Sequence, residues 1–70
     1  MNGLNTMTSE FVGRISVAVW IGRLSDDAAR EALGAYAATY RRIDSAYADS
    51  LHEAILAEYR HRREGQELCS

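Results

Sequence analysis

Apolar side chains recur every three or four positions through the middle of this chain, which is the spacing of one face of an α-helix. The clearest stripe of larger apolar residues comprises Leu33, Tyr36, Tyr40, Ile43 and Tyr47. Between Ser25 and Glu64 there is no proline and one glycine, Gly34, so the residues that most disfavour a helix are nearly absent. The pattern therefore predicts an all-α fold.

We expect a helical hairpin preceded by an N-terminal helix, with the three helices near residues 9–23, 26–43 and 46–64. Together they would form one small helical domain. Its expected span is residues 8–65, and the flanking segments 1–7 and 66–70 are expected to be flexible.

Capping residues mark where the first two helices are expected to begin. Thr8 or Ser9 has a side chain that can accept a free backbone amide at the start of the first helix. Ser25 would do the same for the second helix, and Asp26 and Asp27 follow it where the helix dipole favours negative charge.

The apolar stripe changes phase beyond Tyr47, so the chain either continues as one long helix or breaks between Asp44 and Ser50. A break is favoured because this segment holds four Asp and Ser residues, which compete for backbone hydrogen bonds. Ser50 and Glu53 have the spacing of a capping box, which predicts a helix start there. Gly65, after a cluster of arginines, is expected to end the last helix.

The run from Ile15 to Ile21 has two interpretations. As part of the first helix it would be apolar nearly all round, and that helix would have to be buried within one protomer or between two. As a strand it would alternate β-branched residues with Ser16, Ala18 and Trp20. No second candidate strand exists in the chain, so a strand here would need a partner strand from a second copy. The helix is favoured.

The chain has 70 residues, so its own core can stabilise it only weakly and a homodimer is expected to complete it. The one cysteine, Cys69, excludes an intrachain disulfide and is expected to be an incidental exposed thiol. No secretory signal and no membrane-spanning run is apparent, which favours a cytoplasmic protein without membrane contact. All eight basic residues are arginine, and there are eleven alanines, which suggests a bacterial or phage source.

Charge and chemistry narrow the function classes. The net charge is −2, and residues 25–59 hold seven acidic residues against three arginines, which argues against a general nucleic-acid surface.

No motif links the histidines, serines and Cys69 into a catalytic arrangement, so no enzyme and no cofactor is expected. Acid–histidine pairs at i, i+3 spacing would suit a metal, but such pairs arise easily by chance and no metal is expected. The residues weighed were Glu58 with His61, Asp49 with His52, and Glu31.

Aromatic residues carry the remaining signal, because tyrosine and tryptophan are favoured in protein interfaces. The predicted interface residues are Trp20, Leu33, Tyr36, Tyr40, Ile43, Tyr47 and Tyr59, and Trp20 is the best single anchor. For the tyrosine stripe, an intrachain core and a self-association surface are equally good interpretations.

The leading hypothesis is a non-catalytic interaction module, a small phage- or plasmid-type regulator or inhibitor that docks a helical, partly acidic surface on a host protein. The alternative is a dimeric DNA-binding regulator of the ribbon–helix–helix kind, which the strand interpretation would permit.

Overall fold

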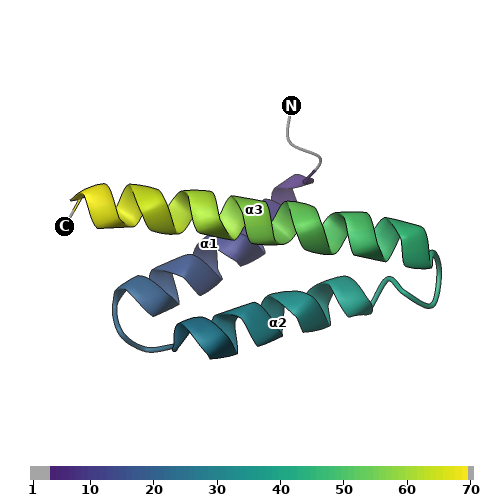
Figure 1. Ribbon diagram of the computed structural model, residues 1–70, viewed down its shortest axis with the longest axis horizontal. Helices are drawn as coiled ribbons and strands as arrows, with labels where there is room; N and C mark the ends of the chain where they lie inside the picture. Colours follow the sequence, from purple (N-terminus) through teal and green to yellow (C-terminus); the bar gives the residue numbers. More distant parts are fainter. Residues whose placement is uncertain (1–3, 70) are drawn as a thin grey trace.

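The computed structural model describes residues 4–69, with Cys69 described by its backbone alone. It contains three helices, α1 (Thr6–Trp20), α2 (Asp26–Ala38) and α3 (Ser45–Cys69), and no strand within the described range. The predicted all-α, three-helix fold is confirmed. Figure 1 shows α2 and α3 side by side as a hairpin, with α1 crossing obliquely behind α3. The long α3 packs against both other helices more extensively than they pack against each other.

Two of the three helix starts are capped by residues other than those predicted. Ser25 caps α2 as expected, since its Oγ accepts the Ala28 amide at 3.1 Å. The cap of α1 is Asn5, whose Oδ1 accepts the Thr8 amide at 2.8 Å, and not Thr8 or Ser9. Those two hydroxyls are used elsewhere. The Thr8 and Tyr36 hydroxyls share a hydrogen bond of 2.9 Å, and Ser9 Oγ accepts one from Arg62 on α3.

The break between the last two helices exists, but it lies closer to the N-terminus than predicted. α2 ends at Ala38 and not near residue 43, and α3 begins at Ser45. The connecting segment turns around Tyr40, whose carbonyl accepts the amides of Ile43 and Asp44, both at 3.0 Å. Asp44 Oδ1 then accepts the Tyr47 amide at 3.1 Å and caps α3. The predicted capping box at Ser50 is wrong, because Ser50 lies inside α3.

Two predicted helix ends are also wrong, and both errors concern glycine. α1 ends at Trp20 and not near residue 23, because Gly22 adopts a φ of 81° that an L-residue rarely takes. The Arg23 amide then reaches the Ala18 carbonyl at 2.9 Å and the Gly22 amide reaches Val19 at 3.1 Å, which is the Schellman arrangement. Gly65 does not end α3, which continues to Cys69.

The strand interpretation of residues 15–21 is wrong, since residues 15–20 are helical and belong to α1. One side of α1 faces the core through Val12, and the opposite side is exposed. The helix is therefore not buried all round within one chain, and of the two predicted alternatives, burial within one protomer or between two, the second stays a prediction.

A narrow core lies where α3 covers the other two helices. Its buried members are Val12, Ala29, Leu33, Ala37, Leu51, Ile55 and Tyr59. The molecule measures 39 × 26 × 16 Å, so its shortest dimension corresponds to about one and a half helix diameters of about 10–12 Å. The chain exposes 4957 Å² of surface, compared with about 4,400 Å² for a typical monomer of its mass. The core is small for the surface around it.

Candidate functional site

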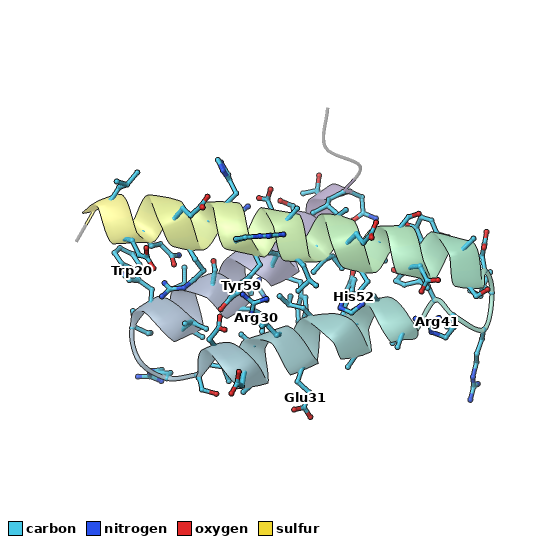
Figure 2. All side chains as sticks on the ribbon, in the orientation of Figure 1. Trp20, Arg30, Glu31, Arg41, His52 and Tyr59 are labelled. Atoms are coloured by element: carbon cyan, nitrogen blue, oxygen red, sulfur yellow. The ribbon has the colours of Figure 1, made fainter. Side chains whose placement is uncertain are left out.

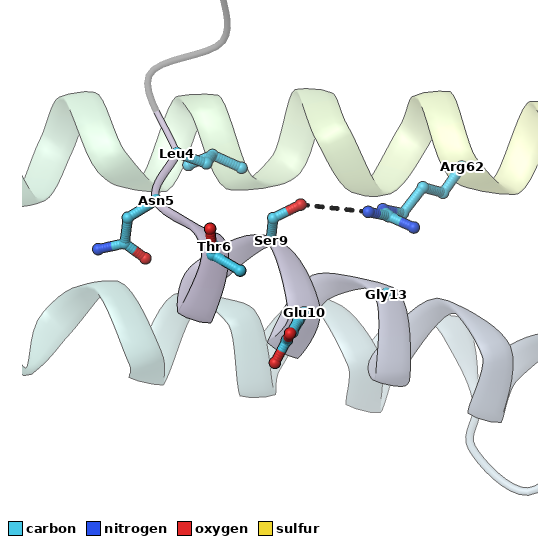
Figure 3. Close-up of a pocket in the computed structure, with 7 residues that line it drawn as sticks. All are labelled: Leu4, Asn5, Thr6, Ser9, Glu10, Gly13 and Arg62. Carbon is cyan, nitrogen blue, oxygen red and sulfur yellow. Dashed lines mark hydrogen bonds between the residues drawn. The ribbon is translucent and has the colours of Figure 1, made fainter.

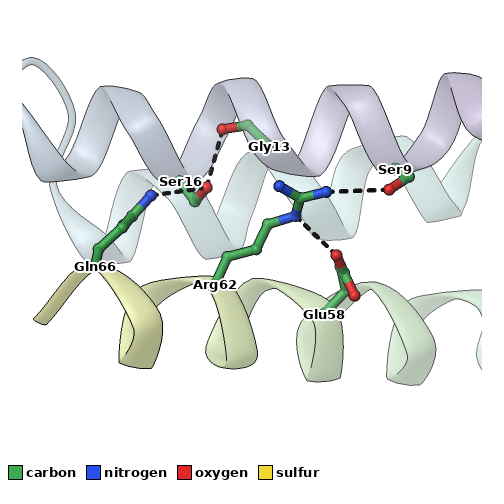
Figure 4. A network of polar contacts seen from close by, with 6 residues as sticks. All are labelled: Ser9, Gly13, Ser16, Glu58, Arg62 and Gln66. Carbon is green, nitrogen blue, oxygen red and sulfur yellow. Dashed lines mark hydrogen bonds and ion pairs between the residues drawn. The ribbon is translucent and has the colours of Figure 1, made fainter. Parts of the chain in front are cut away.

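Polar side chains join α1 to α3 beside the apolar core. Arg62 on α3 donates from Nε to Glu58 at 2.8 Å and from Nη2 to Ser9 on α1 at 3.2 Å (Figure 4). One helical turn further along α3 and two turns further along α1, Gln66 Nε2 donates to Ser16 Oγ at 3.4 Å. Ser16 is fully buried, and its own hydroxyl donates to the Gly13 carbonyl at 2.9 Å. These bonds fix the position of α1 on α3, because a buried polar group without a partner would be costly.

A small residue allows this close approach of the two helices. The Arg62 guanidinium lies over Gly13, and a Cβ placed on Gly13 would come within 3.2 Å of its Nη1 atom. The guanidinium is thus held close to α1 by its bond to Ser9 and by the absence of a side chain at Gly13, and Glu58 pairs with it from α3. From the sequence, the arginine cluster of residues 60–63 was expected to lie at the C-terminal end of the last helix. In the structure one member of the cluster, Arg62, joins α3 to α1.

The exposed side of α1 carries a stripe that runs the length of the helix. We name this stripe, formed by Met7, Glu10, Arg14, Val17 and Ile21, the outer stripe of α1. Its members are spaced three, four, three and four apart, the arrangement by which one helix contacts another. All five are exposed, and the apolar ones expose 73%, 44% and 58% of their surface at Met7, Val17 and Ile21. Trp20 lies beside the stripe near its C-terminal end and is 50% exposed.

The two charged members of the outer stripe are available for pairing. The ion pairs found within residues 4–69 are Arg30–Asp26, Arg41–Asp49 and Arg62–Glu58, and neither Glu10 nor Arg14 takes part in them. Because both side chains are exposed in the middle of an apolar-ended stripe, a partner that docks there would meet one positive and one negative group.

Two shallow depressions border this stripe where α1 faces α3. The first is lined by Leu4, Asn5, Thr6, Ser9, Glu10, Gly13 and Arg62 (Figure 3). The second adjoins it and is lined by Glu10, Gly13, Arg14, Val17 and Arg62. Neither lining includes a histidine or a cysteine.

A second polar cluster ties the start of α2 to α3. The Tyr59 hydroxyl donates to Asp26 Oδ1 at 2.7 Å, Arg30 Nε donates to Asp26 Oδ2 at 2.9 Å, and the Arg30 guanidinium lies 5.8 Å from the centre of the Tyr59 ring. The hydrogen bonds from Tyr59 and Arg30 lower the pKa of Asp26 below its ordinary value. Burial, together with the bond to Asp26, raises the pKa of Tyr59 to about 12. Within the cluster the Asp26 carboxylate receives hydrogen bonds on both of its oxygens, while Asp26 and Arg30 remain about half exposed.

The structure divides the predicted interface residues into buried and exposed groups. Leu33 and Tyr59 lie in the core, 0% and 1% exposed. Tyr36 and Tyr40 are half-buried and belong to an aromatic row that also includes Phe11 and Tyr47. Consecutive ring centres in this row are 4.7, 6.1 and 5.6 Å apart, which are distances of favourable ring contact. Much of the tyrosine stripe therefore contacts other parts of the same chain.

Trp20 and Ile43 are the predicted interface residues at the two ends of the molecule. Figure 2 labels Trp20 near the α1–α2 loop, and Ile43 belongs to the α2–α3 loop at the opposite end, beside the labelled Arg41. Ile43 is 84% exposed, and Tyr47 next to it is exposed as well. These two and Trp20 are the predicted residues that solvent reaches most freely.

The acid–histidine pairs do not converge. Glu58 pairs with Arg62 at 2.8 Å, and the His52 ring lies against Gly34, with Nε2 at 3.4 Å from where a Cβ would stand. Glu31 lies on the exposed side of α2 (Figure 2). Among the residues that the structure describes, no three His, Cys, Asp or Glu side chains form a group that would hold a metal ion. The side chain of Cys69 lies outside the described part of the chain, so its predicted exposure stays a prediction.

Sequence reasoning missed several residues that shape this site. It placed Val17 and Ile21 in a run expected to be buried within one protomer or between two, it left Met7 in a flexible end, and it gave no interface role to Glu10. Their spacing was available as a signal, because residues 7, 10, 14, 17 and 21 repeat every three or four positions. The two charges in the middle concealed the stripe from a search for apolar residues alone.

Comparison with known proteins adds no assignment to this geometry: no family model matches the chain, and no curated protein or solved structure matches it. None of the helices in residues 4–69 is long and apolar enough to cross a membrane. The functional argument therefore depends on the residues themselves.

Proposed function

We propose that this protein is a non-catalytic interaction module, a small regulator or inhibitor that binds a cognate protein through the C-terminal end of α1. The observation that carries the proposal is the exposure of Val17, Trp20 and Ile21, three large apolar side chains at i, i+3 and i+4 that span the last turn of α1 and its C-cap. Helices that dock into apolar grooves present their anchors at this spacing.

Trp20 is the expected anchor of that contact. Half of its surface is exposed at a helix end where Ile21 is also exposed, so neither side chain is fully covered by the chain that carries it. Tryptophan is enriched among the few residues that dominate binding energy, because its large rigid ring fills a pocket at low entropic cost. A partner with an apolar pocket for an indole ring fits this end of the molecule.

Charge supports a protein partner over nucleic acid. Three arginines, Arg30, Arg41 and Arg62, already form ion pairs within the chain, which reduces the positive charge available to phosphates. The ribbon–helix–helix alternative depends on a strand at residues 15–21, and this segment lies in α1 and the turn after it. The interaction module is therefore the better-supported hypothesis.

The test is affinity capture from a bacterial lysate with wild-type protein and with Trp20→Ala. We expect the wild type to retain one protein in near-stoichiometric amount and Trp20→Ala to lose it, because truncation of such an anchor costs more than about 2 kcal/mol. Ile43→Ala serves as the matched control. It removes an exposed large apolar side chain from the opposite end, so it separates specific docking from general stickiness.

Three results would refute the proposal. If Trp20→Ala captures the protein as strongly as the wild type does, Trp20 is not the anchor. If Ile43→Ala abolishes capture as completely as Trp20→Ala does, the binding is nonspecific adhesion. Retention of nucleic acid by the wild type, reversed by arginine substitutions and not by Trp20→Ala, would favour the DNA-binding alternative.

A further inference from the structure

The outer stripe of α1 is chemically self-complementary. It has apolar residues toward both ends, Met7 on one side and Val17 with Ile21 on the other, and one acidic and one basic residue between them, Glu10 and Arg14. We infer that a second copy of this chain docks on this stripe as an antiparallel helix pair, with Glu10 of each copy paired to Arg14 of the other. This inference goes beyond the proposed cognate partner and does not depend on it.

The spacing of the stripe fixes the register of the pair. In an antiparallel helix pair with a two-fold axis, the numbers of any two residues that face each other have the same sum. Pairing Glu10 with Arg14 of the second copy sets that sum at 24 and therefore places Met7 opposite Val17. One register therefore forms two ion pairs at the centre and two apolar contacts outside them, as a closed two-fold interface requires.

Other arrangements of the same two helices bring like charges together. A parallel two-fold pair would place Glu10 against Glu10 and Arg14 against Arg14. An antiparallel pair that matches Met7 with Ile21 would centre on Arg14 and place the two guanidinium groups together. Like charges that face each other across an interface cost several kcal/mol, so these alternatives are disfavoured.

The depression beside the outer stripe can accommodate the apolar contact between Met7 of the second copy and Val17. It is lined by Glu10, Gly13, Arg14, Val17 and Arg62, and it has no side chain at Gly13 to fill it. In the proposed register, Met7 of the second copy lies over Val17 at one side of this depression. Methionine is unbranched and flexible, so it adapts to a shallow irregular surface of this kind. Met7 itself is 73% exposed in the single chain.

The proposed pair leaves Trp20 and Ile21 accessible. In this register Trp20 lies opposite Leu4 of the second copy, before its α1 begins at Thr6, and Ile21 lies beyond Trp20. A dimer built this way presents the proposed anchor twice, once at each end of the helix pair. A cognate protein can then still reach Trp20 and Ile21 in the pair, whereas Val17 is covered by Met7 of the second copy.

The pair is expected to be weak. α1 has 15 residues and is about 22 Å long, so one helix-to-helix contact buries less than the roughly 1,200 Å² of a stable complex. A dissociation constant of tens to hundreds of micromolar is expected, because small interfaces barely exceed the entropic cost of association.

The experiment is sedimentation equilibrium of pure protein from about 10 µM to about 2 mM, a range that brackets this affinity. The variants are Glu10→Arg, Arg14→Glu and the double exchange that carries both. Each single variant places like charges across the two-fold axis and should weaken association at least about tenfold. The double exchange restores both ion pairs and should associate like the wild type. Helical circular dichroism, unchanged in all three, verifies the fold.

A mixture of the two single variants provides the sharpest outcome. Glu10→Arg has two positive charges at the centre of the stripe and Arg14→Glu has two negative ones, so each should fail to pair with itself and should pair with the other. The inference is overturned by a wild type that stays monomeric at the highest concentration, or by a mixture that associates no better than its components. These results leave capture through Trp20 unaffected, so the failure of one proposal is distinguishable from the failure of the other.

Discussion

At the scale of single residues, Tyr59 shows how one side chain can be both a core residue and a polar connector. Its ring is buried among the apolar residues of the core, and its hydroxyl reaches Asp26 at the start of α2. Removing the hydroxyl in Tyr59→Phe should lower the free energy of unfolding by about 1–2 kcal/mol, because the hydrogen bond has a charged acceptor that remains half-exposed to water. Urea denaturation followed by circular dichroism measures this, with Tyr47→Phe, whose ring is exposed, as the control. An equal loss in the control would contradict the expected role.

The Tyr59–Asp26 bond should also depend on pH. The pKa of Asp26 is lowered in the folded state by its bonds to Tyr59 and Arg30. Its contribution to stability is therefore fully present above the unfolded-state pKa of about 3.9 and is lost as the pH falls through the lower folded-state value. The stability difference between the wild type and Tyr59→Phe should narrow below about pH 4. Denaturation curves across the acid range test this, and a constant difference down to about pH 2 would refute it.

Sequence identified Tyr59 as an apolar aromatic residue on a helix stripe, and that much could be predicted. It could not distinguish an intrachain core from an interface, because both bury aromatic residues and the choice depends on which helix faces it. The pairing of Asp26 with Tyr59 joins residues 33 positions apart, and no local spacing rule predicts such a contact. Asp26 with Arg30, four positions apart on one helix, was within reach of such a rule and is present.

At the scale of elements, the start of α3 gives a direct test of the corrected helix boundary. Asp44 caps the helix through the Tyr47 amide, whereas Ser50 is exposed in the helix interior. Asp44→Ala should therefore lower the free energy of unfolding by about 1 kcal/mol. Ser50→Ala should leave it unchanged or raise it slightly, since alanine is the better helix former. Thermal and urea denaturation of the pair measure this, and the opposite order would restore the capping box at Ser50.

The glycines of α2 and of the α1–α2 turn should respond oppositely to alanine. Gly34 lies inside α2 with ordinary space for a Cβ, 3.4 Å from His52 Nε2, so Gly34→Ala should raise the free energy of unfolding by about 0.5–1 kcal/mol. Gly22 has open space around it but a φ of 81°, so Gly22→Ala should lower the free energy of unfolding by about 1–2 kcal/mol. Parallel urea titrations are the measurement, and the same sign in both variants would contradict this account.

Helix existence was predictable here, and helix ends were less so. The three helices follow from spacing and from the lack of proline, which are local properties. The ends depend on which of several candidate caps is free to act. Thr8 and Ser9 look like caps in the sequence, yet their hydroxyls contact Tyr36 and Arg62, and Asn5 performs the capping. Gly65 looks like a stop, yet α3 continues through it.

At the scale of the whole molecule, the thin shape agrees with the prediction that one chain forms only a small core. Three helices around a core in which α1 meets α3 through polar contacts leave the opposite side of α1 uncovered. The sequence supplied the size argument, and a homodimer remains a proposal. It did not identify the surface involved, because the outer stripe of α1 becomes visible only when the other side of that helix is placed on the core.

Self-association through the outer stripe should make the thermal stability of the wild type depend on concentration. A partner that binds only the folded chain raises the apparent free energy of unfolding by about 1 kcal/mol when its concentration is roughly fivefold above the dissociation constant. For a chain of this size, this corresponds to a rise of about 4–8 °C in melting temperature between dilute and millimolar samples. Glu10→Arg, which alters an exposed side chain and leaves the core intact, should melt at a temperature that does not change with concentration. Calorimetry of both proteins measures the difference. Equal behaviour of the two would mean that a single chain is stabilised by its own core alone, and that the uncovered side of α1 contributes nothing to folding.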